Sequence, residues 1–386
     1  MADAETEDQS AVIAFLADPA THGGAEVELV STHCAHVFLT DARAYKIKRA
    51  VRMDYLDFSS LEKRRRALSR ELELNGPGAP GLYLRVASVT GDGTLALDGA
   101  GPEVEPVLVM RRFPKEDELS RIAERGELDA PLADALGAAV ADYHAQAPVR
   151  HADGATLIAE ILDELDAAFA PRADALGPDR VRAFAEQARA AWEAVAPLLT
   201  ARTGEGRVRR GHSDLHLGNI VLLEGRPVPF DALEFDERLG TCDVLYDLAF
   251  LLMDLLHRGL HPQANAVFNR YLFETRDEAG LAAFPLFLAV RAAIRAMVEA
   301  QTAEAAGRPV PEAARRYLDD AAGFMAPAGT RMVAVGGRSG TGKTTLARAL
   351  APDLGRAPGA LHLRSDTERK ALRGVDPLTP LPDDAY

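Results

Sequence analysis

Four polar residues in the middle of the chain have the types and spacing that phosphoryl transfer needs. The string "HSDLHLGN" contains His212, Asp214 and Asn219, and Asp231 follows twelve residues after Asn219. Phosphoryl transfer needs a carboxylate that orients the acceptor hydroxyl and takes its proton. It also needs hard oxygen ligands that hold Mg²⁺ against the phosphates of ATP. We therefore expect Asp214 to be the catalytic base and Asn219 and Asp231 to be the Mg²⁺ ligands.

The order H-x-D-x-x-x-x-N from His212 to Asn219 is the spacing of a kinase catalytic loop. Further along, Asp243 begins the string "DVLYDLA" and has the position of a helix N-cap. With Asp231, these motifs resemble the aminoglycoside phosphotransferase-like kinases, in particular a bacterial group fused to a C-terminal P-loop ATPase or kinase domain. The resemblance covers roughly the first 325 residues. It implies an α+β bilobal protein-kinase-like fold, the cofactors ATP and Mg²⁺, and a small-molecule hydroxyl acceptor.

A kinase of this kind also needs a strand lysine for the phosphates and a helix glutamate that holds the lysine. The string "AYKIKRAV" places Lys46 and Lys48 on one face of a strand, because side chains alternate along a strand. Similarity to the Tyr-Lys-x-Lys string of the fused group favours Lys48. Glu71 is the first candidate for the glutamate and Glu73 the second. The adenine is expected at backbone groups around Met110, where the two lobes join.

The elements that position these residues are predicted to form two lobes. Residues 27–109 read as β-rich runs with one helix among them, and a series of helices with three-four apolar spacing follows. A β-rich island that carries the catalytic residues interrupts these helices. We expect a small β-rich N-lobe over residues 1–113 and a helical C-lobe with the acceptor pocket over 114–326.

A glycine-rich motif near the end of the sequence predicts a second phosphate site. The string "GGRSGTGKT" fits G-x-x-x-x-G-K-[ST], after a predicted buried strand and before a helix. Gly337, Gly340 and Gly342 allow backbone N–H groups to surround a phosphate. Lys343 adds a positive charge, and Thr344 offers a hydroxyl to Mg²⁺. Residues 327–386 are therefore predicted to begin an α/β P-loop NTPase domain.

The segment after this motif predicts a second strand that ends at Asp366 and a helix that carries Arg369. The pair resembles the acceptor-binding segment of P-loop small-molecule kinases, although a helix N-cap with a surface arginine explains it equally well. Only 57 residues lie between Thr330 and Tyr386, whereas a doubly wound domain takes roughly 150. We therefore expect an incomplete, truncated P-loop domain.

The overall composition excludes some partners. Lys and Arg total 44 and Asp and Glu 58, which gives a net charge of −14 and argues against a nucleic-acid partner. No apolar run reaches the ~20 residues of a membrane span. Two distant cysteines, Cys34 and Cys242, and an N-terminus without an apolar segment favour the cytoplasm and no signal peptide.

Three interpretations of the activity remain open from the sequence. The short distance between Asp231 and Asp243 leaves no room for a long peptide-docking segment, which favours a small-molecule kinase. Alternatively, the kinase-like part is a catalytically weak ATP-binding module that regulates its fused partner. A third interpretation places the chemistry in the P-loop domain of a longer native chain.

Overall fold

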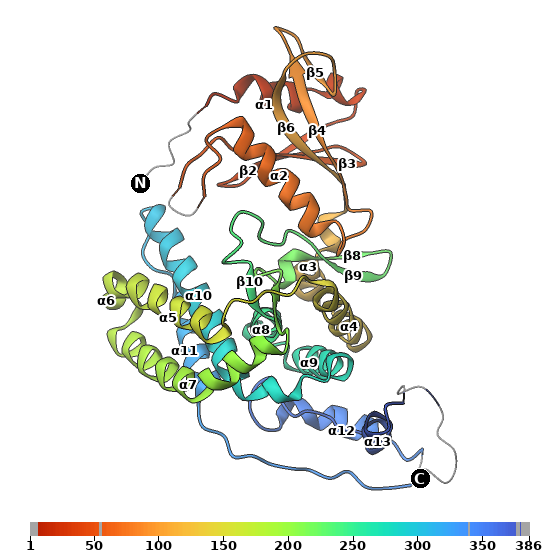
Figure 1. The fold of residues 1–386 in the computed structure, drawn as a ribbon, viewed down its shortest axis with the longest axis vertical. Helices are drawn as coiled ribbons and strands as arrows, with labels where there is room; N and C mark the ends of the chain where they lie inside the picture. The colour runs from red at the N-terminus through yellow and green to blue at the C-terminus, as the bar shows by residue number, and fades with distance from the viewer. Residues whose placement is uncertain (1–6, 54–55, 339, 376–378, 380–386) are drawn as a thin grey trace.

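A six-stranded antiparallel sheet forms the N-terminal lobe of the computed structural model, which describes residues 7–53, 56–338, 340–375 and 379. Its order is β1-β2-β3-β6-β4-β5 (Figure 1). The strands are β1 (Glu28–Ser31), β2 (Ala35–Leu39), β3 (Arg43–Lys48), β4 (Tyr83–Gly91), β5 (Leu95–Leu97) and β6 (Glu103–Arg111). The predicted β-rich runs therefore form one sheet, and β3 in its centre carries both candidate lysines.

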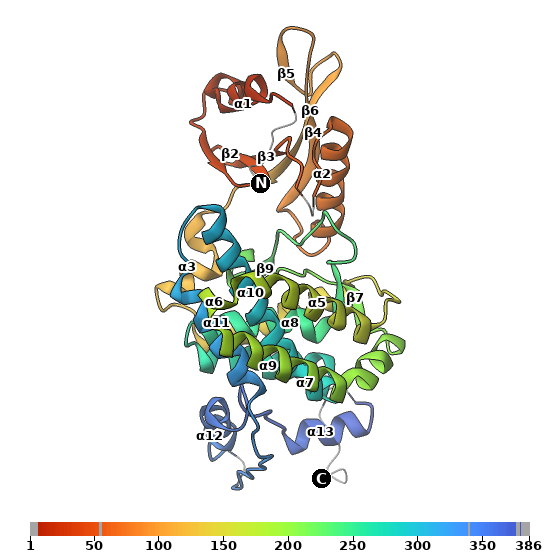
Figure 2. The same ribbon diagram turned by 90° about the vertical axis from the view of Figure 1, so that its left-hand side faces the viewer.

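Two helices cover opposite faces of this sheet (Figure 2). On one face, Leu16 of α1 (Ser10–Ala17) packs in a cluster with Ile47. On the other, Leu68 of α2 (Leu61–Asn75) packs with Ala44. The predicted helix is α2, and Ser60 is its N-cap because its side chain accepts a hydrogen bond from the backbone N–H of Lys63 (3.4 Å). Helix α1 was not predicted from the sequence.

A single large apolar core holds the helical C-lobe together. At its centre lies α8 (Val244–His257), in which every residue from Val244 to Leu256 is buried. The other helices are α3 (Leu119–Glu124), α4 (Ala130–Gln146), α5 (Gly154–Phe169), α6 (Ala173–Leu176), α7 (Pro178–Gly204), α9 (His261–Thr275), α10 (Phe284–Ala305) and α11 (Glu312–Met325). The chain is thus a bilobal kinase-like fold with a sheet in one lobe and helices in the other. The exact division at residues 113 and 326 stays a prediction.

The predicted β-rich island forms two small antiparallel pairs beside α8. One joins β7 (Val208–Arg210) to β10 (Thr241–Asp243), and the other joins β8 (Ile220–Leu223) to β9 (Arg226–Pro229). Asp243 caps α8, as predicted, by accepting a hydrogen bond from the N–H of Leu245 (2.8 Å). The buried Arg202 guanidinium clamps Asp243 (2.6 Å) and Asp277 (2.6 Å). This network ties the start of α8 to α7, which carries Arg202.

One stretch, Glu278–Ala305, is long and apolar enough to cross a membrane by length and composition alone. Within its most apolar window, 61% is buried inside the protein. Such burial is what a core helix of a soluble protein shows, because its apolar side chains pack on neighbouring helices. Both α8 and α11 pack against α10 in this way.

The predicted P-loop strand is wrong for the residues that the structure describes. Between 327 and 375 the described residues contain α12 (Lys343–Leu350), a short 3-10 turn and α13 (Ser365–Leu372), but no strand. Met332 is 95% exposed and Val333 55% exposed, although both were expected in a buried strand. A strand needs neighbouring backbones for its N–H and C=O groups. No described segment pairs with this one, so the apolar pattern alone does not make it a strand.

This C-terminal segment docks onto α9 of the C-lobe. The Asn265 side chain donates hydrogen bonds to the carbonyls of Pro358 (3.1 Å) and Ala360 (3.1 Å). The N–H of His362 donates to the side-chain oxygen of Asn269 (2.6 Å). Polar contacts along one helix face therefore hold the segment against the kinase-like lobes (Figure 1).

Candidate active site

The loop after β7, which carries the predicted catalytic residues, is held in place by a buried carboxylate on α8. Asp247 accepts hydrogen bonds from the backbone N–H groups of His212 (2.7 Å) and Ser213 (2.8 Å). Its other neighbour is His144 (3.2 Å), whose ring also binds the Tyr271 hydroxyl (2.8 Å). Burial raises the pKa of Asp247, but the hydrogen bond and charge of His144 outweigh this and hold it well below its usual range. The second aspartate of "DVLYDLA", Asp247, thus fixes the loop backbone.

Asp214 and Asn219 form a hydrogen-bonded pair within this loop. The Asn219 amide donates to the Asp214 carboxylate (2.8 Å) and to the Asp214 carbonyl (2.9 Å). Burial favours a raised pKa for Asp214, but His216, His212 and Arg291 together hold the pKa at about 2. The carboxylate is therefore ionised at neutral pH and can accept a hydrogen bond from a hydroxyl group.

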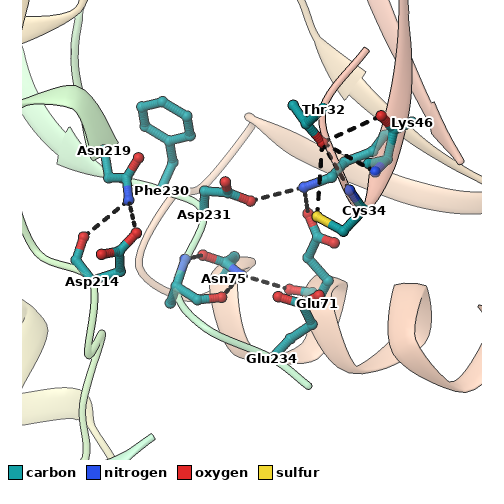
Figure 3. A network of polar contacts seen from close by, with 12 residues as sticks. Thr32, Cys34, Lys46, Glu71, Asn75, Asp214, Asn219, Phe230, Asp231 and Glu234 are labelled. Atoms are coloured by element: carbon teal, nitrogen blue, oxygen red, sulfur yellow. Dashed lines mark hydrogen bonds and ion pairs between the residues drawn. The ribbon is translucent and has the colours of Figure 1, made fainter. Parts of the chain in front are cut away.

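Asp231 lies opposite this pair in an uncommon backbone conformation. Its φ of +60° is left-handed, and its N–H donates to the Tyr83 hydroxyl (2.8 Å). Its carboxylate receives a hydrogen bond from Lys46 (2.8 Å) and is 44% exposed. Burial of the site favours a raised pKa for Asp231, but the charge of Lys46 lowers it. Figure 3 shows Asp231 between Lys46 and the Asp214–Asn219 pair.

The two strand lysines share Glu71, but only one of them reaches Asp231. Lys46 pairs with Glu71 (2.7 Å) and Asp231 (2.8 Å), whereas Lys48 pairs with Glu71 (2.7 Å) and Glu234 (2.5 Å). The Lys48 side chain is only 2% exposed, whereas that of Lys46 is 13% exposed and faces Asp231. The geometry therefore favours Lys46, against our preference for Lys48. The choice of Glu71 fits the network, since Glu73 pairs with Arg70 on the surface (2.9 Å).

The expected adenine contact at backbone groups around Met110 stays a prediction. Met110 lies inside β6, where its backbone pairs with Ala44 of β3 and Tyr83 of β4. Its side chain packs in the cluster that contains Leu68. The strand β6 continues one residue further, to Arg111, which pairs with Arg43 of β3. The connection between the lobes therefore begins at residue 112, and Met110 is a core residue of the N-lobe.

The residues around Asp214 fit a divalent cation. The Asn219 amide uses its nitrogen on Asp214, so its carbonyl oxygen stays available for a metal. Asp231 adds a half-exposed carboxylate. Amide and carboxylate oxygens are the hard ligands that Mg²⁺ prefers. Among the described residues, no group of three or more His, Cys, Asp and Glu side chains is placed to hold a metal ion.

The glycine-rich motif lies apart from this site, at the opposite end of the C-lobe (Figure 1). Gly340 and Gly342 have φ of +78° and +83°, which the absence of a side chain permits, and α12 begins at Lys343. The Lys343 ammonium donates to the Arg338 carbonyl (2.6 Å). Thr344 lines a cavity of about 1100 Å³ whose wall also includes Asp366. Gly337 also has a positive φ, of +155°. Arg369 lies on a helix, α13, as the sequence predicts.

Several residues of the site were not singled out by the sequence. Glu234 carries no motif, and only the structure shows it against Lys48. His216 received no role, yet its ring stands 3.6 Å from the Asp214 carboxylate and packs edge-on against Phe250. Both rings line a small cavity of about 260 Å³ next to the catalytic loop. The position of His216 inside the "HSDLHLGN" string was the one available signal.

Known proteins resemble this chain in sequence. A family model described as "Phosphotransferase enzyme family" matches residues 42–284. An uncharacterized protein of Mycobacterium tuberculosis (strain ATCC 25618 / H37Rv) is 32% identical over 359 residues, which cover 92% of this chain and 70% of the relative. An uncharacterized protein of Mycobacterium bovis matches to the same extent. The chain thus aligns with these relatives across both lobes and into the C-terminal segment.

Solved structures of similar shape show lower identity. A choline/ethanolamine kinase family protein from Mesorhizobium loti is 16% identical, with a TM-score of 0.48, and the match covers 82% of this chain and 93% of that one. The GDP complex of aminoglycoside 2'-phosphotransferase-IIIa is 13% identical, with a TM-score of 0.48 and coverage of 82% and 99%. A glucosamine kinase with glucosamine, ADP and phosphate is 17% identical, with a TM-score of 0.45 and coverage of 78% and 74%. These likenesses identify no acceptor for this chain.

Proposed function

Because the chain belongs to the phosphotransferase enzyme family, we propose that it transfers the γ-phosphate of ATP to a hydroxyl group of a small molecule. One observation carries the proposal: Asp231 lies between Lys46 and the Asp214–Asn219 pair. A lysine that can bind phosphate, a carboxylate that can bind a metal ion, and a carboxylate that can act as a base thus lie in one network. Phosphoryl transfer depends mainly on such positioning and on stabilising the charge of the phosphate.

Asp214 is proposed as the residue that orients the acceptor hydroxyl. Its ionised carboxylate accepts a hydrogen bond from the hydroxyl and receives the proton as the new O–P bond forms and the bond to the leaving ADP oxygen breaks. Asn219 holds that carboxylate in place through its amide nitrogen. Asn219 and Asp231 would hold Mg²⁺, which supplies positive charge to the phosphates when it is bound.

Lys46 is proposed as the residue that binds the ATP phosphates. Its ammonium is held by Glu71 and Asp231 and is 13% exposed. Burial favours a lowered pKa for Lys46, but the carboxylates of Asp231 and Glu71 raise this pKa well above its usual range. Lys46 therefore stays protonated at neutral pH. Lys48 and Glu234 then support Glu71 from the buried side of the network.

The cavity of about 260 Å³ beside the catalytic loop is proposed as part of the acceptor pocket. Its wall combines Glu118 of the segment before α3 with Phe250 and Asp254 of α8 and with Tyr317 of α11. The segments predicted to build the acceptor site therefore meet here, next to His216. Pockets for drug-sized ligands usually measure ≈ 300–1,000 Å³. A cavity below this range is too small to hold a large acceptor by itself, which agrees with its being one part of the pocket.

The glycine-rich motif is proposed as a second phosphate site. The left-handed glycines and the start of α12 at Lys343 support it, because N–H groups at a helix N-terminus favour anions. Asp366 and Arg369 remain acceptor candidates of this site, since α13 carries both and Asp366 lines the same cavity. Two alternative functions remain to be tested: a regulatory ATP-binding role for the kinase-like part, and catalysis at this second site. The variants Lys343→Ala and Asp214→Ala distinguish them.

We also propose that the protein acts in the cytoplasm, without a nucleic-acid or membrane partner. The net charge of −14 supports this for nucleic acids. The deep burial of the apolar helix α10 supports it for membranes.

The proposal is tested by ATP consumption with Mg²⁺ across a panel of small hydroxyl compounds. We expect one class of compound to stimulate ATP turnover in the wild type and in Lys343→Ala, but not in Asp214→Ala. Asp142→Ala is the matched control, because Asp142 is an exposed aspartate on α4. Turnover lost in Lys343→Ala but kept in Asp214→Ala would place the chemistry at the second site. ATP binding without turnover on any compound would favour the regulatory role.

A further inference from the structure

A buried arginine on α10 reaches the catalytic loop from the interior of the C-lobe. Arg291 is 5% exposed. Its guanidinium lies 3.9 Å from the ring centre of Tyr246 and 4.9 Å from that of Phe250, both on α8. One nitrogen donates to the Ser213 carbonyl (3.1 Å), and another stands 3.7 Å from the Asp247 carboxylate. The arginine thus touches the residue that directly precedes Asp214.

Ser213 needs such support because of its backbone conformation. Its φ is +66°, in the left-handed region that residues with side chains seldom adopt. Its N–H is held by Asp247 (2.8 Å) and its carbonyl by Arg291 (3.1 Å). Two oppositely charged side chains therefore fix the two ends of one strained residue. Removing either one releases the backbone that orients Asp214.

We propose that Arg291 is a positioning residue for phosphoryl transfer, which fixes the peptide between Ser213 and Asp214. The inference rests on the proposed function for its catalytic consequence. The Ser213 carbonyl belongs to the same peptide plane as the Asp214 N–H, so holding it sets the direction of the Asp214 side chain. Contacts with the Tyr246 and Phe250 rings, and a hydrogen bond to the Tyr246 carbonyl (3.3 Å), hold the guanidinium in this position.

A purely structural role for Arg291 predicts a different behaviour. In that case the arginine only balances the buried charge of Asp247. However, Asp247 already accepts two backbone N–H groups and contacts His144, so its charge has other partners. The nitrogen of Arg291 that faces Asp247 makes no hydrogen bond. The hydrogen bonds of the arginine go instead to two carbonyls, that of Ser213 (3.1 Å) and that of Tyr246 on α8 (3.3 Å). They tie the loop to α8, which favours positioning over charge balance.

The test compares Arg291→Lys with Arg202→Lys, the same change at a buried arginine that contacts Asp243 and Asp277 but not the loop. Lysine keeps the charge and loses the planar fork that donates to the carbonyls of both Ser213 and Tyr246. With ATP·Mg²⁺ as the probe, we expect Arg291→Lys to lower ATP turnover at least tenfold. Binding of AMP-PNP·Mg²⁺ should stay within threefold of the wild type. Arg202→Lys should lower thermal stability and keep turnover per folded molecule.

Hydrogen exchange of the loop gives a second readout that does not depend on activity. We expect the amides of residues 213–219 to exchange at least tenfold faster in Arg291→Lys, and at the wild-type rate in Arg202→Lys. Unchanged exchange in Arg291→Lys, or turnover within threefold of the wild type, would overturn the inference. A wild type without ATP turnover would instead refute the proposed function, and the exchange comparison would still decide whether Arg291 holds the loop.

Discussion

Lys46→Met and Lys48→Met are predicted to have opposite consequences, although the two lysines stand two residues apart on one strand. Lys46 faces Asp231 and is 13% exposed, whereas Lys48 is 2% exposed between Glu71 and Glu234. The first is placed to meet a phosphate and the second to hold the network together. Methionine keeps a similar length and removes only the charge.

The magnitudes follow from the partners that each change leaves behind. Lys46→Met removes a charge-assisted contact to phosphate of about 2–3 kcal/mol, which lowers kcat/KM roughly 30–150-fold. The cost in stability is about 1–2 kcal/mol, because Glu71 keeps Lys48 and the half-exposed Asp231 meets water. Lys48→Met leaves the buried Glu234 without its cation. Breaking a buried pair in this way lowers the free energy of unfolding by about 3–5 kcal/mol.

The assay combines urea unfolding, AMP-PNP·Mg²⁺ calorimetry and ATP turnover on the same preparations. We expect Lys46→Met to be folded with weakened nucleotide binding and turnover. We expect Lys48→Met to unfold at clearly lower urea, with near-normal nucleotide affinity per folded molecule. The reverse pattern, a stable Lys48→Met without nucleotide binding, would refute the assignment of Lys46 and restore Lys48 as the phosphate lysine.

Three further predictions concern stability and docking. Asp214 and Asp247 have lowered pKa values in the folded protein, so their ionised forms stabilise the fold at pH values above about 4. This contribution to stability is lost as the pH falls further. A urea midpoint that rises from pH 5 to pH 3 would contradict this expectation. Arg202→Met removes the cation that contacts two buried aspartates, Asp243 and Asp277, and should cost about 3–5 kcal/mol in urea unfolding. A loss below about 1 kcal/mol would show that these two ion pairs are not needed for stability. The double change Asn265→Ala and Asn269→Ala should release residues 351–368 to faster tryptic cleavage with unchanged ATP turnover at Asp214, and an unchanged cleavage rate would show that these contacts do not hold the segment.

The chemistry of the site could be predicted where one short string contains it. Asp214 and Asn219 stand five residues apart in one loop, so their pairing is set by local sequence. The choice between Lys46 and Lys48 could not be predicted in the same way. Both lie on the same strand face, and the difference is their distance to Asp231, 185 residues further along the chain from Lys46. Arg291 carries no motif, because its role depends on the packing of α10 against α8.

The expected strand near residue 333 shows that an apolar pattern alone does not predict a strand. Its apolar residues predict a strand only if other strands stand beside it. The described segment has none, and its backbone stays exposed. The helix after the glycine loop formed as predicted, because its hydrogen bonds are internal and need no partner. Local elements were therefore predictable here, and those that depend on distant partners were not.

The most direct test of the central claim is transfer of radiolabelled γ-phosphate from ATP by the wild type and by Asp214→Asn. Asparagine preserves the shape and the contact with Asn219 but cannot take a proton. We predict that AMP-PNP·Mg²⁺ binding stays within threefold while turnover falls ~10²–10⁴-fold, the usual contribution of a positioned acid–base residue. Turnover of Asp214→Asn within threefold of the wild type would contradict the account and remove Asp214 from the reaction.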